Sequence, residues 1–139
     1  MRVAARCLFR YQDQLLTISA RDPDKPEPHY GVPGGGVKFG ETSEQALRRE
    51  MREELGAEIA DLELCAVTEE IAEVLGQTHH EIVFLYEGRF VDPGFYARPV
   101  IPYVEGPEPR AKATWMLVSV FRSGEKRLLP VRLVDMLKE

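Results

Sequence analysis

Three glutamates are spaced so that they fall on one face of a predicted helix. Glu50, Glu53 and Glu54 stand at positions i, i+3 and i+4, and a helix that turns by about 100° per residue brings their carboxylates together. Glu50 and Glu54 form a like-charge pair, which costs on the order of a few tenths of a kcal/mol. Carboxylate oxygens are the ligands that Mg²⁺ and Mn²⁺ prefer. The spacing therefore predicts a helix that holds a divalent cation.

The basic residues of the same segment do not neutralise this stripe on the helical wheel. Arg48 and Arg52 fall on the far side of the helix, and Arg49 only flanks the stripe. We therefore expect a cation from solution to supply the missing positive charge.

The neighbouring residues extend the stripe into a longer pattern. Five residues separate Gly35 from Glu41, and seven more lead to the segment REMREELGA, which begins at Arg49. This pattern resembles the signature of the Nudix hydrolases, G-x5-E-x7-R-E-U-x-E-E-x-G-U, where U is a bulky aliphatic residue. All seven fixed identities are present, and the mild departures, Met51 and Ala57, are at packing positions. The preceding YGVPGG also resembles the lead-in of the family.

The resemblance implies a metal site and a fold. It implies that Glu50 and Glu54 bind Mg²⁺, or Mn²⁺ in its place, and that Glu53 binds the metal or holds a metal-bound water. It also implies a backbone carbonyl ligand from Gly34, and an α/β/α sandwich with a mixed central sheet. We assign Glu53 and Glu54 to catalysis.

Residues before the helix are expected to serve the substrate and the loop. Glycines let backbone groups approach phosphates closely, so Gly35, Gly36 and the nearby Lys38 are our substrate-binding candidates. In the family, Glu41 and Arg49 are commonly tied together, and we assign this pair to support of the loop.

The expected reaction is substitution at phosphorus in a diphosphate, with the metal neutralising the developing charge. Within the pattern, Glu53 is the best general base. The family often recruits another glutamate from a later loop or strand, and Glu81, at the start of an apolar segment, is a candidate, although a solvated strand end is its more ordinary explanation. The other candidates are Glu69, Glu70, Glu73, Glu105 and Glu108.

We therefore expect a metal-dependent pyrophosphohydrolase that cleaves a nucleoside diphosphate linked to a group X. Nucleoside triphosphates and nucleotide sugars both remain open. One alternative is a catalytically idle Nudix fold that senses a nucleotide. Another is a calcium-stabilised structural domain, although the alternating Asp/Asn ligands of an EF-hand are absent from the sequence.

Composition predicts one soluble domain over residues 1–139, as a monomer or homodimer. The net charge of −5 argues against a binder of nucleic acid polymers, which needs a basic face. No apolar run approaches the roughly 18 residues of a membrane span, and none resembles a signal peptide. Cys7 and Cys65 are isolated and predicted to be reduced. We expect a cytoplasmic enzyme.

The alternation of apolar and polar residues, together with the positions of Pro and Gly, predicts the helices and strands. The expected helices run from near Thr42 to Gly56 and over Val131–Lys138. The expected strands are Val3–Phe9, Leu15–Ser19, Leu62–Thr68, Ile82–Tyr86 and Thr114–Val120. Loops are expected at Arg21–His29, across the irregular glycine turn 33–36, and at Pro93–Pro109.

The two long loops are predicted to form the walls that select the nucleoside and X. Aromatic rings near them could stack on a base, and arginines in them could bind a terminal phosphate, although core packing and solvation explain such residues equally well. The candidates are Tyr30, Phe39, Phe95, Tyr96, Tyr103, Arg98 and Arg110.

Overall fold

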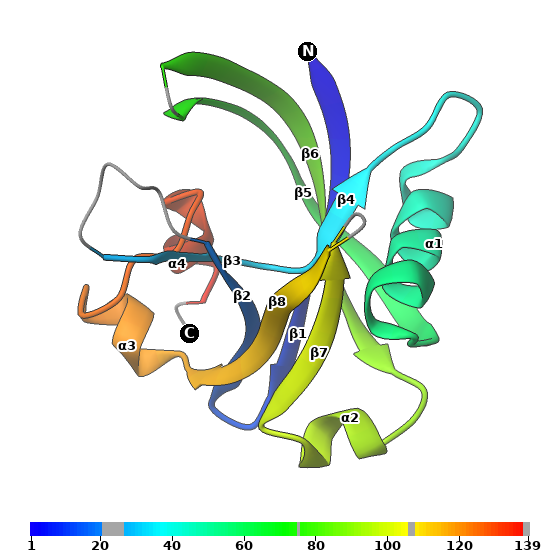
Figure 1. The fold of residues 1–139 in the computed structure, drawn as a ribbon, viewed down its shortest axis with the longest axis vertical. Helices are drawn as coiled ribbons and strands as arrows, with labels where there is room; N and C mark the ends of the chain where they lie inside the picture. Colours follow the sequence, from blue (N-terminus) through cyan, green and yellow to red (C-terminus); the bar gives the residue numbers. More distant parts are fainter. Residues whose placement is uncertain (21–26, 75, 106–107, 138–139) are drawn as a thin grey trace.

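We describe residues 1–20, 27–74, 76–105 and 108–137 of a computed structural model of the chain. Short helices and long strands alternate along it (Figure 1). In chain order the elements are β1 (Arg2–Tyr11), β2 (Gln14–Ala20), β3 (His29–Gly31), β4 (Gly34–Gly36), α1 (Ser43–Leu55), β5 (Ile59–Val74), β6 (Gln77–Phe90), α2 (Gly94–Ala97), β7 (Val100–Glu105), β8 (Glu108–Leu117), α3 (Ser119–Arg122) and α4 (Arg132–Met136).

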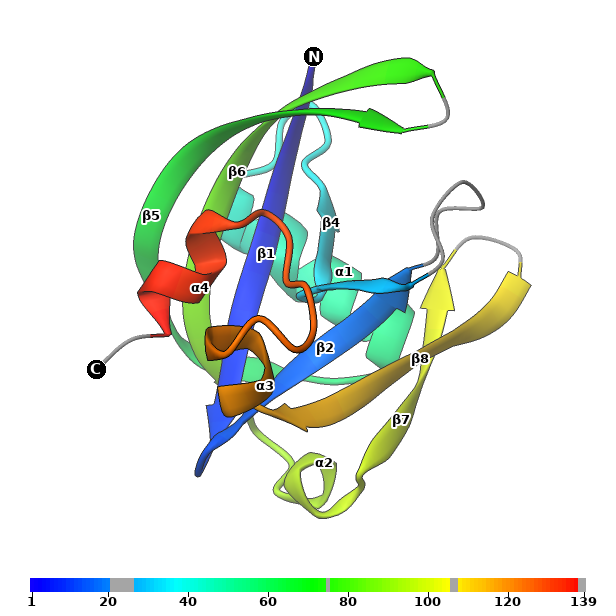
Figure 2. The same cartoon turned by 90° about the vertical axis from the view of Figure 1, so that its left-hand side faces the viewer.

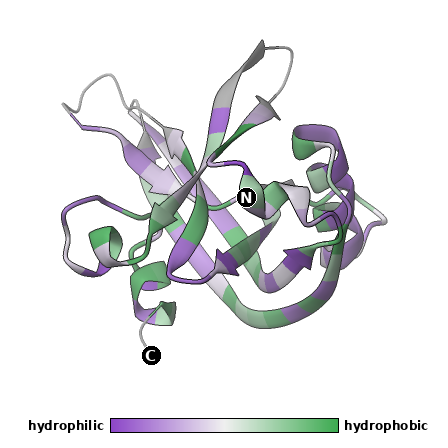
Figure 3. Cartoon of the chain, turned by 90° about the horizontal axis from the view of Figure 1, so that it is seen from below, coloured by the Kyte–Doolittle hydropathy of each residue, from purple (hydrophilic) through white to green (hydrophobic). Residues whose placement is uncertain are grey.

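The strands form one mixed sheet. Its order is β5-β6-β1-β2-β8-β7, with β3 paired to β2 and β4 paired to β1. Strands β1 and β6 are parallel, and the other pairs are antiparallel. Hydrophobic and hydrophilic segments both occur along the strands (Figure 3), and the middle of β1, which is covered on both faces, is a nearly continuous run of buried residues.

Helices cover both faces of the sheet. Helix α1 lies on one side, and α3 and α4 lie on the other (Figures 1 and 2). Alternate residues of β1 supply the two cores: Ala5, Cys7 and Phe9 pack in the α1 layer, and Leu8 packs in the layer of α3 and α4. The predicted α/β/α sandwich with a mixed central sheet is confirmed.

Local signals in the sequence fix the ends of α1. The Thr42 side chain accepts a hydrogen bond from the Gln45 N–H, and the Gln45 side chain accepts one from the Thr42 N–H, which is a complete capping box. Gly56 ends the helix in the left-handed conformation with φ 66°. Leu47 and Met51 are fully buried against the sheet. This packing directs the glutamate stripe toward the edge of the α1 layer.

Several predicted boundaries were wrong. The glycines 34–36 form strand β4 instead of an irregular turn, and they pair with residues 4–6 of β1. Pro93–Pro109 is no loop, because it contains α2 and all of β7. The predicted strand Thr114–Val120 ends at Leu117, and its last residues start α3.

The strands after α1 are longer than predicted. β5 and β6 pair from Ile59–Phe90 to Val74–Gln77, and their hairpin arches beyond the rest of the sheet (Figure 2). The final helix is also shorter than predicted, at Arg132–Met136. Residues 21–26 of the first predicted loop lie outside the described residues. Across the described ranges, every helix is too short or too polar to span a bilayer.

Candidate active site

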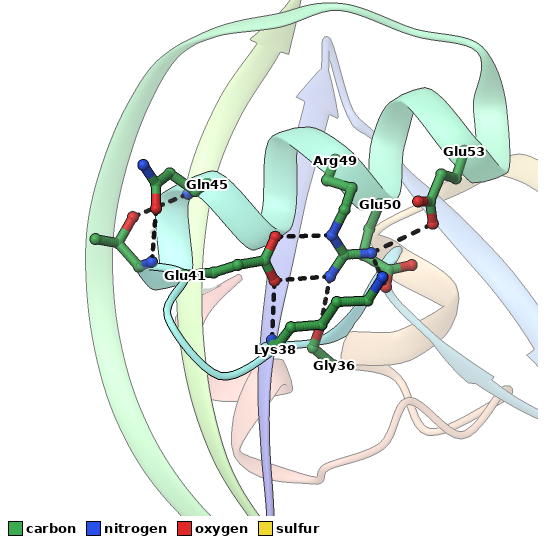
Figure 4. A network of polar contacts seen from close by, with 8 residues as sticks. Gly36, Lys38, Glu41, Gln45, Arg49, Glu50 and Glu53 are labelled. Atoms are coloured by element: carbon green, nitrogen blue, oxygen red, sulfur yellow. Dashed lines mark hydrogen bonds and ion pairs between the residues drawn. The ribbon is translucent and has the colours of Figure 1, made fainter.

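The three glutamates of the predicted metal stripe differ in burial. Glu54 is 6% exposed and is one of few charged residues in the interior. The Glu50 side chain is 17% exposed, whereas that of Glu53 is 56% exposed at the rim (Figure 4). Burial of two carboxylates from the same helical face is costly without positive charge. The arrangement therefore depends on cations nearby.

Strand β4 provides a cradle for one of these carboxylates. A Cβ atom built on Gly35 would lie 2.5 Å and 2.6 Å from the two carboxylate oxygens of Glu50. Such distances are shorter than any ordinary contact, so only glycine permits this approach. The missing side chain of Gly35 thus leaves the space that the Glu50 carboxylate occupies, and Arg49 holds the carboxylate there.

Arg49 is the centre of the polar network (Figure 4). Its Nε and Nη2 donate to the two oxygens of Glu41 at 2.8 Å and 2.9 Å. Nη2 also donates to the Gly36 carbonyl at 2.9 Å, and Nη1 donates to Glu50 at 2.9 Å and to Glu53 at 3.3 Å. These five bonds match the five N–H donors of a guanidinium. The expectation that Arg49 only flanks the stripe was wrong, because its long side chain reaches into it.

Glu41 and Lys38 belong to the loop before α1. Hydrogen bonds from Arg49, and from the Lys38 backbone N–H at 2.8 Å, lower the pKa of Glu41 to about 2. The hydrogen bonds to Glu41 in turn raise the pKa of Arg49. The Lys38 side chain extends along α1 from this loop (Figure 4). The structure thus joins the loop to the helix through the Glu41–Arg49 pair.

The donor set fits a hard divalent cation such as Mg²⁺ or Mn²⁺. Glu50, Glu53 and Glu54 offer carboxylate oxygens, and the Gly35 cradle directs Glu50. No group of three His, Cys, Asp or Glu side chains among the described residues is already gathered for an ion. The reason is visible in the network, since Glu53 points to Arg49. Glu53 is exposed enough to rotate away from Arg49, so the three residues could converge on a bound ion.

Gly34 lies at the base of the site. A Cβ there would lie 2.8 Å from Cγ of Arg6, so β4 packs tightly on β1. The buried Tyr103 hydroxyl donates toward the Gly34 carbonyl at 3.5 Å. Tyr103 is therefore part of the core beneath the site and is not available to stack on a base.

The candidate bases outside the stripe have other partners or lie apart. Glu69 of β5 contacts His80 of β6 at 2.8 Å. Glu70 of β5 contacts Arg132 of α4 at 2.7 Å. Glu73 is exposed at the hairpin. The side chains of Glu105 and Glu108 lie outside the described residues.

Glu81 contacts two arginines that sequence reasoning missed. Its carboxylate lies 3.6 Å from Nη1 of Arg2 and 4.0 Å from Nη2 of Arg6. The predicted first strand, Val3–Phe9, left Arg2 out, whereas β1 begins at Arg2 and pairs it with Glu81 of β6.

The remaining substrate-binding candidates, the aromatic residues and arginines near the two long loops, differ in how deeply they are buried. Phe95 is buried, and Arg98 stacks on its ring at 4.6 Å. Tyr96 packs against Phe90 and Trp115 at the other end of the sheet. Tyr30 is half-buried beside Phe121. Phe39 is fully exposed on the loop before α1, and the Arg110 side chain lies outside the described residues.

Comparisons with known proteins agree with this geometry. The chain is 50% identical over 60 residues to a Mycobacterium tuberculosis protein provisionally named 8-oxo-dGTP diphosphatase 2 (43% of this chain, 42% of that protein). It is 51% identical over 37 residues to the RNA pyrophosphohydrolase of Teredinibacter turnerae (27% of this chain, 22% of that protein). The chain thus spans less than half the length of these curated relatives.

A solved structure and a family model extend the likeness to nearly the whole chain. The Nudix hydrolase of Nitrosomonas europaea superimposes with a TM-score of 0.65 at 20% identity, over 98% of this chain and 84% of that one, which shows a shared fold. The family model of the NUDIX domain matches residues 1–130. With the signature of residues 35–57 folded onto α1 and β4, this match shows that the chain belongs to the Nudix hydrolase family.

Proposed function

We propose that the chain is a divalent-metal-dependent pyrophosphohydrolase that cleaves a nucleoside diphosphate linked to X. The observation that carries this proposal is the Glu50 carboxylate held in the Gly35 cradle, one helical turn from the buried Glu54. Two carboxylates so placed are suited to a hard cation, and hard cations bind the oxygens of phosphates.

Glu50 and Glu54 would hold Mg²⁺ or Mn²⁺, with the Gly34 carbonyl as a further candidate ligand. When bound, such an ion neutralises phosphate charge and lowers the pKa of water. Glu53, which is exposed and close to Glu50 through Arg49, would accept the proton of the attacking water. Lys38 and the backbone of Gly35 and Gly36 would position the phosphate chain.

The names of the relatives favour triphosphate substrates. One relative is named for a nucleoside triphosphate, 8-oxo-dGTP, and the other is named for pyrophosphohydrolysis of RNA. We propose that this chain takes a nucleoside triphosphate or a 5′-triphosphate end, and releases pyrophosphate together with the nucleoside monophosphate or the 5′-monophosphate end.

The test is a substrate panel with product analysis. Nucleoside triphosphates, damaged nucleoside triphosphates, 5′-triphosphate RNA and nucleotide sugars are each incubated with Mg²⁺, and the phosphate products are separated. We expect pyrophosphate and a monophosphate, with no turnover in EDTA or by Glu54→Gln. A wild-type protein that binds a nucleotide tightly without releasing any phosphate product would favour the idle sensor instead.

A further inference from the structure

Three charged residues lie in a row on the face of the sheet that is opposite α1. Arg2 on β1 is directly beside Glu81 on β6 in the parallel register. Arg6 follows on the same face of β1, and Glu81 lies between the two guanidinium groups, 3.6 Å from Arg2 and 4.0 Å from Arg6. The Glu81 side chain is 22% exposed. We call Arg2, Arg6 and Glu81 the arginine clamp.

The arginine clamp lies against the glycine strand of the active site. A Cβ built on Gly36 would lie 3.2 Å from Nη2 of Arg2, and one built on Gly34 would lie 2.8 Å from Cγ of Arg6. Arg6 also donates to the carbonyl of Val32 at 3.3 Å. Gly35, between the two, faces the Glu50 carboxylate. A single backbone strand therefore separates the arginine clamp from the metal-site glutamates.

The glycine strand has an edge at which a phosphate chain could pass from one face to the other. In the described residues, β4 pairs only with β1. A phosphate chain bound there needs positive charge in addition to the metal. Arg49 is poorly suited to supply it, because three of its five N–H donors bind Glu41 and Gly36 and hold its guanidinium at the loop, even where Glu53 turns to the metal.

Arg2 can supply that charge. Its contact with Glu81, at 3.6 Å, is too long for a hydrogen bond, and its side chain is 58% exposed. The contact directs the guanidinium over Gly36 without using up its donors. A planar guanidinium in this position can bind two phosphate oxygens at once.

We propose that Arg2 binds a phosphate of the substrate beyond the cleaved anhydride, and that Glu81 is a positioning residue that holds Arg2 and Arg6 against the glycine strand. The inference rests on the proposed function and narrows it, because it requires X to carry a phosphate. It also gives Glu81 a role other than general base.

The first experiment separates Arg2 from an ordinary surface arginine. Arg89 is a matched control, because it is also on the sheet, is 55% exposed and pairs with one carboxylate, Asp61. We measure the binding of inorganic tripolyphosphate to the metal-free protein by calorimetry in EDTA. We expect Arg2→Gln to weaken binding about tenfold, the loss of one charge-assisted contact, and Arg89→Gln to change it less than twofold. Equal affinities in wild type and Arg2→Gln, or no binding by the wild type, would overturn the inference.

Steady-state kinetics then test the positioning role. For a nucleoside triphosphate with saturating Mg²⁺, we expect Arg2→Gln and Glu81→Gln each to raise KM about tenfold, with kcat within threefold of wild type. The double variant should be no worse than either single variant, because the two residues act as one unit. A drop of 100-fold or more in kcat for Glu81→Gln, with loss of the acidic limb of the pH profile, would make Glu81 the base and overturn the assignment.

The two proposals fail in different ways. A wild type that binds tripolyphosphate through Arg2 and yet cleaves no substrate on the panel would refute the proposed hydrolysis and leave the arginine clamp standing. If the wild type cleaves triphosphates and Arg2→Gln changes neither binding nor KM, the arginine clamp would be refuted and the proposed hydrolysis would stand.

Discussion

The Gly35 cradle predicts a large catalytic effect from adding one methyl group. In Gly35→Ala the new Cβ would lie 2.5 Å from the nearer oxygen of Glu50, whereas ordinary contacts begin at 3.4 Å. The difference, 3.4 − 2.5, requires the carboxylate to move by about 1 Å. Because the obstructing atoms are at the end of a flexible side chain, the fold should survive. A displacement of about 1 Å in a catalytic group can cost roughly 100-fold in rate.

The assay is kcat/KM with a triphosphate substrate and Mg²⁺, together with the melting temperature of the metal-free protein. Gly31→Ala, at the end of the neighbouring short strand β3, is a matched control, since its Cβ would lie 3.9 Å from the nearest atom, the Leu129 carbonyl oxygen. We expect Gly35→Ala to lose about 100-fold in kcat/KM and Gly31→Ala to lose less than threefold. If Gly35→Ala keeps the wild-type kcat/KM, then the position of Glu50 does not govern the reaction and the reasoning fails.

Three further predictions concern the charges of the site. Glu54→Gln should abolish turnover and retain the wild-type circular dichroism spectrum, because it removes the buried charge while keeping the side-chain shape; near-normal activity in Mg²⁺ would contradict the assignment. Mg²⁺ or Mn²⁺ at 100 times Kd should raise the free energy of unfolding of the wild type by about 2.7 kcal/mol, which is an increase of several degrees in the melting temperature. The increase should be much smaller for Glu50→Gln. Equal increases in both proteins would mean that the ion binds elsewhere. Because the pKa of Glu41 is lowered to about 2 from its ordinary value of 4.5, its contribution to stability is complete above pH 4.5 and is lost as the pH falls through about 2. Glu41→Gln should therefore be less stable than wild type near neutral pH, and the two melting temperatures should converge in acid; a constant difference down to pH 2 would contradict the lowered pKa.

Sequence patterns predicted the parts of the site that depend on local signals. The capping box of Thr42 and Gln45, the apolar stripe and Gly56 define α1 within a few residues, because helix ends are set by neighbouring side chains. The one-face arrangement of the three glutamates follows from the same periodicity. The family and its sandwich fold followed from the motif.

Contacts between distant segments could not be predicted in this way. The glycines 34–36 have little strand propensity, and they form β4 because the missing side chains let their backbone approach β1 and Glu50. A helical wheel places Arg49 by its Cα angle alone, whereas its long side chain reaches Glu41 and Glu53 at once. The arginine clamp needs the register of β1 with β6, which no local pattern contains.

The order of the strands has a consequence for solubility. Strands β5 and β7 stand at the two ends of the six-strand order β5-β6-β1-β2-β8-β7, and an uncovered edge invites pairing with another chain. On β7, Pro102 removes a backbone donor. On β5, register shifts between Ala60 and Ala66 interrupt the edge, and exposed glutamates repel a second copy of the same strand. Aggregation should therefore be governed by the charge of β5, and replacing its exposed glutamates with glutamine should promote edge-to-edge assembly of the folded protein.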